Sequence, residues 1–185
     1  MKQVFAWALG LVALVSLGNA STAFATESDY SYIGVKKCTM CHKKDDVGAQ
    51  HKIWLGTKHA TAFESLASEK SLEAAKAMGI DDPQADMRCL KCHATAANVM
   101  ATLATEKIQL ADGVACESCH GPGSGYYKKK TMKAIADGTT TGESVGLFNP
   151  TKETCIVCHE GDGNPFQKPF DYEKALAAIA HPIPE

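Results

Sequence analysis

The chain has 185 residues, of which 45% are hydrophobic and 22% are charged, and its formal net charge is −2. This composition is that of an ordinary globular domain and excludes a collagen, a polyelectrolyte tail and a multi-span membrane protein. A charge so close to zero also gives no reason to expect nucleic acid as a partner.

The first 25 residues have the pattern of a secretory signal peptide. Lys2 precedes an apolar run from Val4 to Leu17, and Ala23-Phe24-Ala25 fits the small-x-small rule for cleavage. The run is short of the roughly 20 residues that a transmembrane helix needs, so an uncleaved anchor is the second alternative. We expect residues 1–25 to be removed and residues 26–185 to form one exported domain, periplasmic or at the cell surface, with no stable membrane span.

Apolar side chains are scarce in the mature part of the chain. Leu, Ile, Val and Phe make up 26 of its 160 residues, about 16%, a fraction typical of chains that cannot fold. The net charge is nevertheless small and the sequence is not low in complexity. Either the chain is disordered, or something other than aliphatic side chains supplies its core.

All eight cysteines belong to four copies of the motif Cys-x-x-Cys-His. The copies are Cys38, Cys41 and His42; Cys89, Cys92 and His93; Cys116, Cys119 and His120; and Cys155, Cys158 and His159. This pattern is the attachment signature of c-type haem. Cysteines one helical turn apart share a face, where each thiol can bond one haem vinyl group, and the following His can reach the iron. We therefore predict four covalently bound haem c groups, which would form the missing core.

Three other chemistries also use paired cysteines. Zinc does not explain a His after every pair, and a thioredoxin-like dithiol needs a single pair in a βαβ context. Disulfides suit the compartment, but cysteines so close in sequence rarely bridge without strain. Haem is favoured over all three. It implies that the haem-free chain is largely unfolded, and that four neighbouring haems can relay electrons.

Periodicity and helix breakers predict one mainly α-helical domain with long loops and little β-structure. Helices are expected over about 57–78, 94–105, 127–137 and 172–180; Gly79, Gly138 and Pro182 end three of them. The stretches 138–150 and 160–170 are rich in Gly, Pro and Thr and predict loops. The motifs are unequally spaced, so the chain has no fixed-period repeat.

Four irons have eight axial positions, but the chain has seven histidines. Beyond the motifs, His51, His59 and His181 are the candidate ligands. His59 is expected to open the first helix on a face shared with Phe63 and Leu66, and His181 follows the last helix, whereas His51 either reaches a haem or lies in solvent. One position is left to Met, to water or an open site, or to a His of a neighbouring subunit. The available methionines are Met78, Met87, Met100 and Met132.

Several segments around the motifs are also distinctive. The third motif lies between Gly113-Val114-Ala115 and Gly121-Pro122-Gly123, Lys58-His59-Ala60 leads into Phe63-Glu64-Ser65-Leu66, and the tail contains Pro165-Phe166 and Phe170-Asp171-Tyr172 before His181. With the order of the four motifs, these segments make the sequence resemble the tetrahaem cytochromes c related to cytochrome c-554 of nitrifying bacteria. The likeness covers most of the mature chain.

The resemblance implies a mainly helical fold with stacked haem pairs, and electron transfer as the activity. It implies that His59 ligates the haem of the third motif, that His181 ligates the haem of the fourth, and that the haem on His93 is five-coordinate. In that family the first haem takes a His from the segment after the third motif. Residues 121–149 contain no histidine here, so His51 is the substitute expected for the haem on His42.

The basic stretch Tyr126–Lys130 with Lys133 indicates either a solvated helix face or a docking site for an acidic redox partner. Glu117 and Ser118 are expected to face solvent. We predict an electron carrier, not an enzyme, that serves anaerobic respiration through other cytochromes, quinol-linked proteins or terminal reductases. Two alternatives remain: a self-associating subunit of an extracellular cytochrome filament, and a redox enzyme for nitric oxide or hydroxylamine at an open haem near His93.

Overall fold

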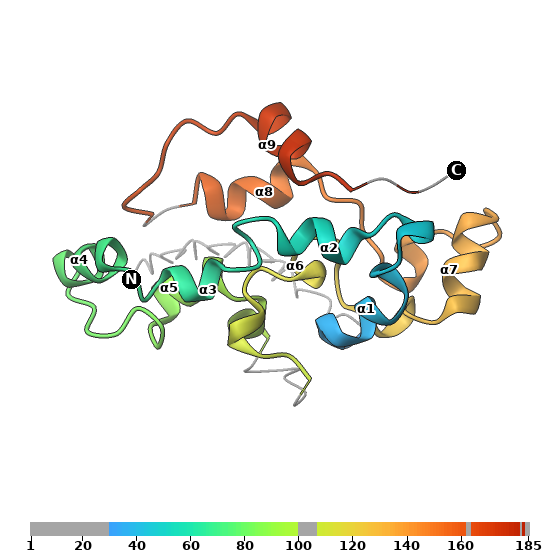
Figure 1. Cartoon of the computed structure of the whole chain (residues 1–185), viewed down its shortest axis with the longest axis horizontal. Helices are drawn as coiled ribbons and strands as arrows, with labels where there is room; N and C mark the ends of the chain where they lie inside the picture. The colour runs from blue at the N-terminus through green and yellow to red at the C-terminus, as the bar shows by residue number, and fades with distance from the viewer. Residues whose placement is uncertain (1–29, 100–106, 162–163, 182, 184–185) are drawn as a thin grey trace, which may run out of the picture.

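The protein is described by a computed structural model that covers residues 30–99, 107–161, 164–181 and 183, and it consists of short helices joined by loops (Figure 1). These residues contain no strand, which confirms the mainly α fold. The α-helices are α1 (Val35–His42), α2 (Gln50–Leu55), α3 (Ala62–Ser65), α4 (Glu69–Ala77), α5 (Met87–His93), α6 (Cys116–His120), α7 (Lys129–Ala136), α8 (Lys152–His159) and α9 (Tyr172–Ile179). The 3-10 turns are η1 (Asp45–Val47), η2 (Thr95–Asn98), η3 (Leu110–Asp112), η4 (Gly123–Gly125) and η5 (Glu143–Val145).

The expected signal peptide, residues 1–25, lies outside the described residues. Among the helices that are described, none has the length and apolar character needed to cross a membrane.

The helix expected over 57–78 is interrupted, and this prediction was wrong in its first half. Residues 57–61 form turns, α3 ends at Ser65, and α4 begins after Ser68. Serine hydroxyls cause the break, because Ser65 Oγ donates to a carbonyl of its own turn at 2.6 Å and Ser68 Oγ donates to Ser65 O at 2.7 Å. Such bonds compete with the helical ladder. The C-terminal end is as expected, since Gly79 follows the helix with φ 65°.

The helix expected over 94–105 is also not formed where the structure describes it. Ala94 is extended, with φ −149°, and Thr95–Asn98 make the 3-10 turn η2. The N–H of Thr95 donates to Gly113 O at 2.9 Å, so it bonds across to the segment before α6 rather than along a helix. Residues 100–106 lie outside the described part of the chain.

The two later helices are confirmed. The helix expected over 127–137 is α7, followed by Gly138 with φ 69°. The helix expected over 172–180 is α9, which Asp171 caps by accepting a hydrogen bond from the N–H of Lys174 at 3.1 Å. The described residues of the loop segments 138–150 and 160–170 contain turns and bends and one 3-10 turn, η5.

Apolar packing within the polypeptide is concentrated around α5 and η2. Two small buried clusters lie there, one built on Leu66 and Leu90 and the other on Val99 and Ile108. Of the 13 buried hydrophobic residues in the described part, five are alanines, and Pro83 is the largest side chain that is fully buried. The side chains alone therefore form only a small core, as the scarcity of Leu, Ile, Val and Phe predicts.

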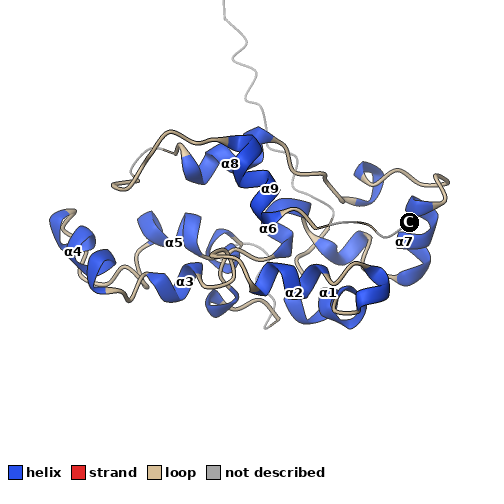
Figure 2. Ribbon diagram, turned by 45° about the horizontal axis from the view of Figure 1, so that its top comes forward, coloured by secondary structure: helices blue, strands red, loops and turns tan. Residues whose placement is uncertain are grey.

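The four helices that carry the motifs succeed one another along the molecule in the order α5, α8, α6, α1 (Figures 1 and 2). This order differs from their order in the sequence, because α8 lies between the second and third motifs. The fold therefore makes one row of attachment sites whose ends are the second motif, on α5, and the first, on α1.

Candidate haem sites

Each motif forms the end of its helix. Helices α1, α5, α6 and α8 all terminate at their motif histidine. Because residues i, i+3 and i+4 share a helix face, both sulfurs and the imidazole of each motif lie on one side. None of the eight cysteines is joined to another by a disulfide. Within the described residues, no three His, Cys, Asp or Glu side chains form a group that could hold a metal ion by themselves, as a zinc site requires.

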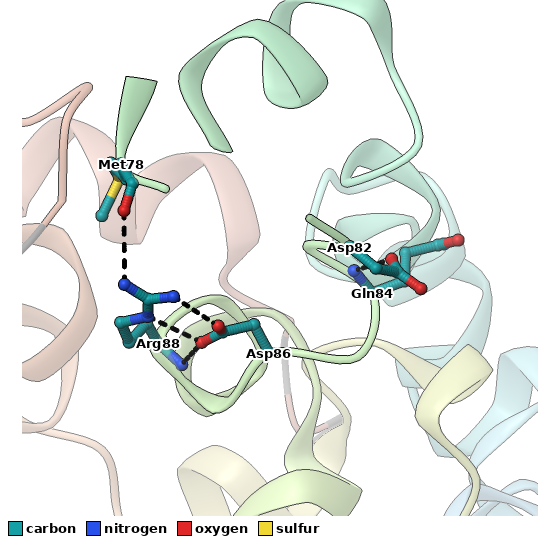
Figure 3. Close-up of polar contacts among 5 residues, drawn as sticks. All are labelled: Met78, Asp82, Gln84, Asp86 and Arg88. Atoms are coloured by element: carbon teal, nitrogen blue, oxygen red, sulfur yellow. Dashed lines mark hydrogen bonds and ion pairs between the residues drawn. The ribbon is translucent and has the colours of Figure 1, made fainter. Parts of the chain in front are cut away.

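The helix of the second motif begins with an ion pair (Figure 3). Asp86 Oδ1 accepts from Arg88 N at 2.8 Å and from Arg88 Nε at 2.9 Å, and a further Arg88 nitrogen donates to Met78 O at 3.4 Å. In the turn before it, Asp82 Oδ1 accepts from Gln84 N at 2.8 Å. The hydrogen bonds from Arg88 lower the pKa of Asp86 from the usual 3.8 to about 2. The Asp86 carboxylate that caps α5 is therefore charged above pH 4. Its stabilising contribution is lost only as the pH falls toward 2.

Three of the four motif histidines have a fixed Nδ1 partner. The Nδ1 atoms of His93, His120 and His42 lie 2.8 Å from Ala62 O, 3.1 Å from Phe148 O and 3.2 Å from Gln50 Oε1. A proton on Nδ1 satisfies each of these acceptors and leaves the lone pair of Nε2 for a metal. The chain therefore sets the tautomer that an iron ligand needs.

Two pairs of histidine rings face one another across a gap. The ring centroids of His59 and His159 are 6.0 Å apart, and those of His120 and His181 are 5.8 Å apart. Two imidazoles on opposite sides of one metal ion have centroids about 6 Å apart, because each metal–nitrogen bond is about 2 Å. Burial, and then the neighbouring His159, lower the pKa of His59, which favours the neutral form that binds metal. These pairs fit two bis-histidine haem irons.

The pairing differs from the one that the resemblance implies. His59 faces the histidine of the fourth motif, and His181 faces that of the third, so the two distal candidates are exchanged. The tail explains this exchange, since the ring of Phe170 stacks on His159 at 4.5 Å and α9 then runs on to bring His181 beside α6.

His59 is held by its backbone rather than by a helix. Its carbonyl accepts from Val114 N at 2.9 Å, and a Cβ on Gly113 would lie 2.6 Å from the same oxygen. Gly113 also has φ 61°, so this close approach requires glycine. The expectation that His59 opens a long helix was wrong, but the residue does face a motif histidine.

The ring of His51 contacts Trp54 rather than the histidine of the first motif. The two rings stack at 5.6 Å between centroids, and Trp54 Nε1 donates to Val114 O at 2.9 Å. The interpretation of His51 as the distal ligand of His42 is thus not supported by the ring geometry. In the described part of the chain, no histidine ring is paired with His42 or with His93. Of the methionines named above, Met87 is 52% exposed at the start of α5, and Met100 lies outside the described residues.

Cysteines of different motifs lie near one another in pairs. Cys38 of the first motif is close enough to Cys116 of the third that their interaction raises the pKa of Cys38 and lowers that of Cys116. Cys92 of the second motif lies near Cys158 of the fourth in the same way, with its own pKa lowered and that of Cys158 raised. Cys119 interacts electrostatically with Cys155 across the middle of the row. The motifs therefore follow one another as first, third, fourth and second.

The side chain of Glu117 is buried, contrary to the prediction. It was expected in solvent, but it is only 3% exposed and its carboxylate accepts backbone hydrogen bonds. The neighbouring Ser118 is exposed, as expected, and its hydroxyl bonds that of Thr95. One signal for Glu117 was available, because it is the only acidic residue between the cysteines of any of the four motifs.

Comparison with known proteins identifies the family of the chain. The family described as cytochrome c554 and c-prime matches residues 37–121. Cytochrome c-554 of Nitrosomonas europaea is 32% identical over 180 residues, an alignment that covers 90% of this chain and 73% of that protein. No solved structure matches the chain.

Proposed function

Since the chain belongs to the cytochrome c-554 family, whose members are electron-transfer proteins with covalently bound haem c, we propose that it is an exported tetrahaem carrier of single electrons in anaerobic respiration. When bound, each haem iron supplies reversible exchange of one electron between its ferric and ferrous states. The chain attaches these groups through its eight cysteines and orients them through His42, His93, His120 and His159. The signal-peptide pattern of residues 1–25 supports a location in the periplasm or at the cell surface.

One observation carries the proposal most directly, namely the single row in which the four motif helices lie (Figures 1 and 2). Along this row Cys38 lies near Cys116 and Cys92 lies near Cys158, so each attachment site adjoins the next. Haems attached at adjoining sites would be close enough to exchange electrons. The row also has two ends, α1 and α5, which suits a carrier that accepts electrons at one end and delivers them at the other.

A stoichiometric reduction tests this proposal. The purified holoprotein is expected to yield four haems per chain in the pyridine haemochrome assay and to accept four electrons per chain from dithionite, each reversibly. The expected potentials are low, because histidine pairs lack the thioether sulfur that raises the potential of His/Met haems. Fewer than four haems per chain, or irreversible reduction, would contradict the tetrahaem carrier.

The α1 end of the row has the features of a docking surface for an acidic redox partner. Cys41 is exposed whereas the other cysteines are half-buried, and the neighbouring Met40 is 56% exposed. Four exposed lysines flank this point, at positions 36, 37, 43 and 44. The ion pairs of the described residues involve none of them. An exposed apolar contact flanked by lysines that take no part in these ion pairs favours fast, weak association with an acidic partner, although the exposed Asp45 and Asp46 follow Lys44.

The basic helix α7 lies beside α1 in both views (Figures 1 and 2). It adds exposed lysines at positions 128, 129 and 130 to the same end of the molecule, while Lys133 pairs with Asp137 at 2.8 Å. Tyr126, which the sequence analysis included in this stretch, is buried and takes no part in the surface. The docking proposal therefore rests on both helices.

Reversing two charges on α1 tests the docking end. In the variant K36E/K37E, oxidation of the reduced holoprotein by ferricyanide, an anionic reagent, is expected to slow about tenfold at low ionic strength, because electrostatic steering is lost. The difference should shrink in high salt. The matched control is K76E/K91E, which reverses two exposed lysines at the α5 end. An equal loss of rate in the control would contradict docking at α1.

A second function has one observation in its favour: among the residues that the structure describes, no histidine ring is paired with that of His93. An open iron there would bind nitric oxide or a similar small ligand. The hydroxyl of Thr95, the first polar side chain after His93, already accepts from Ala115 N at 2.8 Å and bonds Ser118. Turnover of nitric oxide by the reduced holoprotein would favour this enzyme over the carrier. A filament subunit would instead elute as a polymer from a size-exclusion column.

A further inference from the structure

Glu117 is a buried acidic side chain that the electron-transfer proposal does not use. It lies on α6, between the two attachment cysteines of the third motif, and is 3% exposed. Its Oε1 atom accepts from Ile33 N at 2.9 Å and from Gly123 N at 2.7 Å, and its Oε2 atom accepts from Gly34 N at 2.8 Å. The carboxylate therefore joins the start of α1 and the turn η4 to the helix of the third motif.

The contacts of Glu117 are those of a negatively charged group. Every hydrogen bond recorded to it comes from a backbone N–H, and each of its oxygens accepts. None of the ion pairs among the described residues includes it. Backbone dipoles thus stabilise the charge without cancelling it, and the low dielectric of the interior extends its effect on neighbouring groups.

The field of this carboxylate reaches two attachment sites. It raises the pKa of Tyr32, after the larger effect of burial. Hydrogen bonds from Ile33 and Gly34 hold the carboxylate at the start of α1, one turn before Cys38. Cys116 directly precedes Glu117 in α6. No other motif has an acidic residue between its cysteines.

We propose that Glu117 is a positioning residue that lowers the reduction potentials of the haems attached to α1 and α6 by placing a fixed, buried negative charge against their attachment sites. A ferric haem carries one more positive charge than a ferrous haem, so a nearby carboxylate stabilises the oxidised form. One electron from the electrode reduces each iron, and no proton or further reactant is needed. The inference requires haem attachment at these two motifs and does not require the respiratory role.

The test is a potentiometric titration of the holoprotein with Glu117→Gln. This variant keeps the size of the side chain and removes its charge. We expect the reduction potential of one or two of the four one-electron steps to rise by at least 59 mV, which is tenfold in equilibrium constant for a one-electron couple. The potentials of the remaining steps should not change. The control is Glu160→Gln, which removes an exposed charge directly after the fourth motif and is expected to leave all four potentials nearly unchanged.

A merely structural role predicts a different result. If E117Q holoprotein with four haems titrates as the unmodified protein does, the electrostatic role is wrong. If E117Q does not acquire four haems, Glu117→Asp decides, because it keeps the charge but shortens the reach to the three N–H groups. In the Glu117→Asp holoprotein, unchanged potentials with a lowered melting temperature would support the proposed role of the charge. Potentials that rise as the contacts loosen would contradict that role. Either outcome is separable from a failure of the carrier proposal, which the haem count tests.

Discussion

Replacing His59 with Ala is expected to convert one of the four ferric haems from low spin to high spin. The ring of His59 lies 6.0 Å from that of His159, so its removal takes away the sixth ligand of a single iron. His181→Ala should do the same to the iron on His120. Electron paramagnetic resonance and the visible spectrum of the ferric holoprotein measure the change. The control is His51→Ala, whose ring stacks on Trp54, and it should leave the number of low-spin haems as it was.

The pairing itself can be separated from the loss of a ligand. In a C155A/C158A background, which lacks the attachment sulfurs of the fourth motif, His59→Ala is expected to add no high-spin signal. In a C116A/C119A background it should still add one, because the affected iron is that of the fourth motif. The reverse result would restore the pairing that the family resemblance implies and contradict the ring geometry of the structure.

Replacing all eight cysteines with Ala is expected to abolish cooperative folding. Without attached haem, the chain has the two small clusters around α5 and η2 as its apolar core, with little burial elsewhere. The whole folding free energy is then lost, which for a domain is typically about 5–15 kcal/mol. The thermal transition followed by circular dichroism should become broad and non-cooperative, with the holoprotein as the control.

The double variant C155A/C158A gives the graded comparison. It removes one attachment site within the row, on α8, and should lower the melting temperature while leaving a cooperative transition for the remaining three sites. A sharp transition in the chain without cysteines would show that the polypeptide supplies its own core. The prediction that haem replaces aliphatic side chains would then be wrong.

The cofactor chemistry was predictable from the sequence because it is local. Cysteines at i and i+3 and a histidine at i+4 meet on one face of any helix, whatever surrounds it. The ends of α4 and α7 were also predictable, since Gly79 and Gly138 adopt the positive φ that ends a helix. The break at Ser65 was missed because hydroxyl groups there bond to backbone carbonyls, a competition that apolar periodicity does not reveal.

Which histidines face one another was not predictable in this way. The residues His59 and His159 are separated by 100 positions, and they meet because the segment before α6 holds the backbone of His59 while Phe170 packs on His159. The burial of Glu117 has the same origin, since its three hydrogen-bond donors belong to segments on either side of it that only the folded chain brings together.

The sequence by itself therefore determined the motifs, their cysteines and histidines, the mainly helical class and the shortage of one histidine, all of which depend on residue type and short spacing. The tertiary structure alone decided the order of the motifs along the molecule, the partners of His59 and His181, and the position of the charge on Glu117. The physical reason is that ligand pairs and buried charges depend on contacts between distant segments, whose closeness is set by the packing of loops and helices and not by any local pattern.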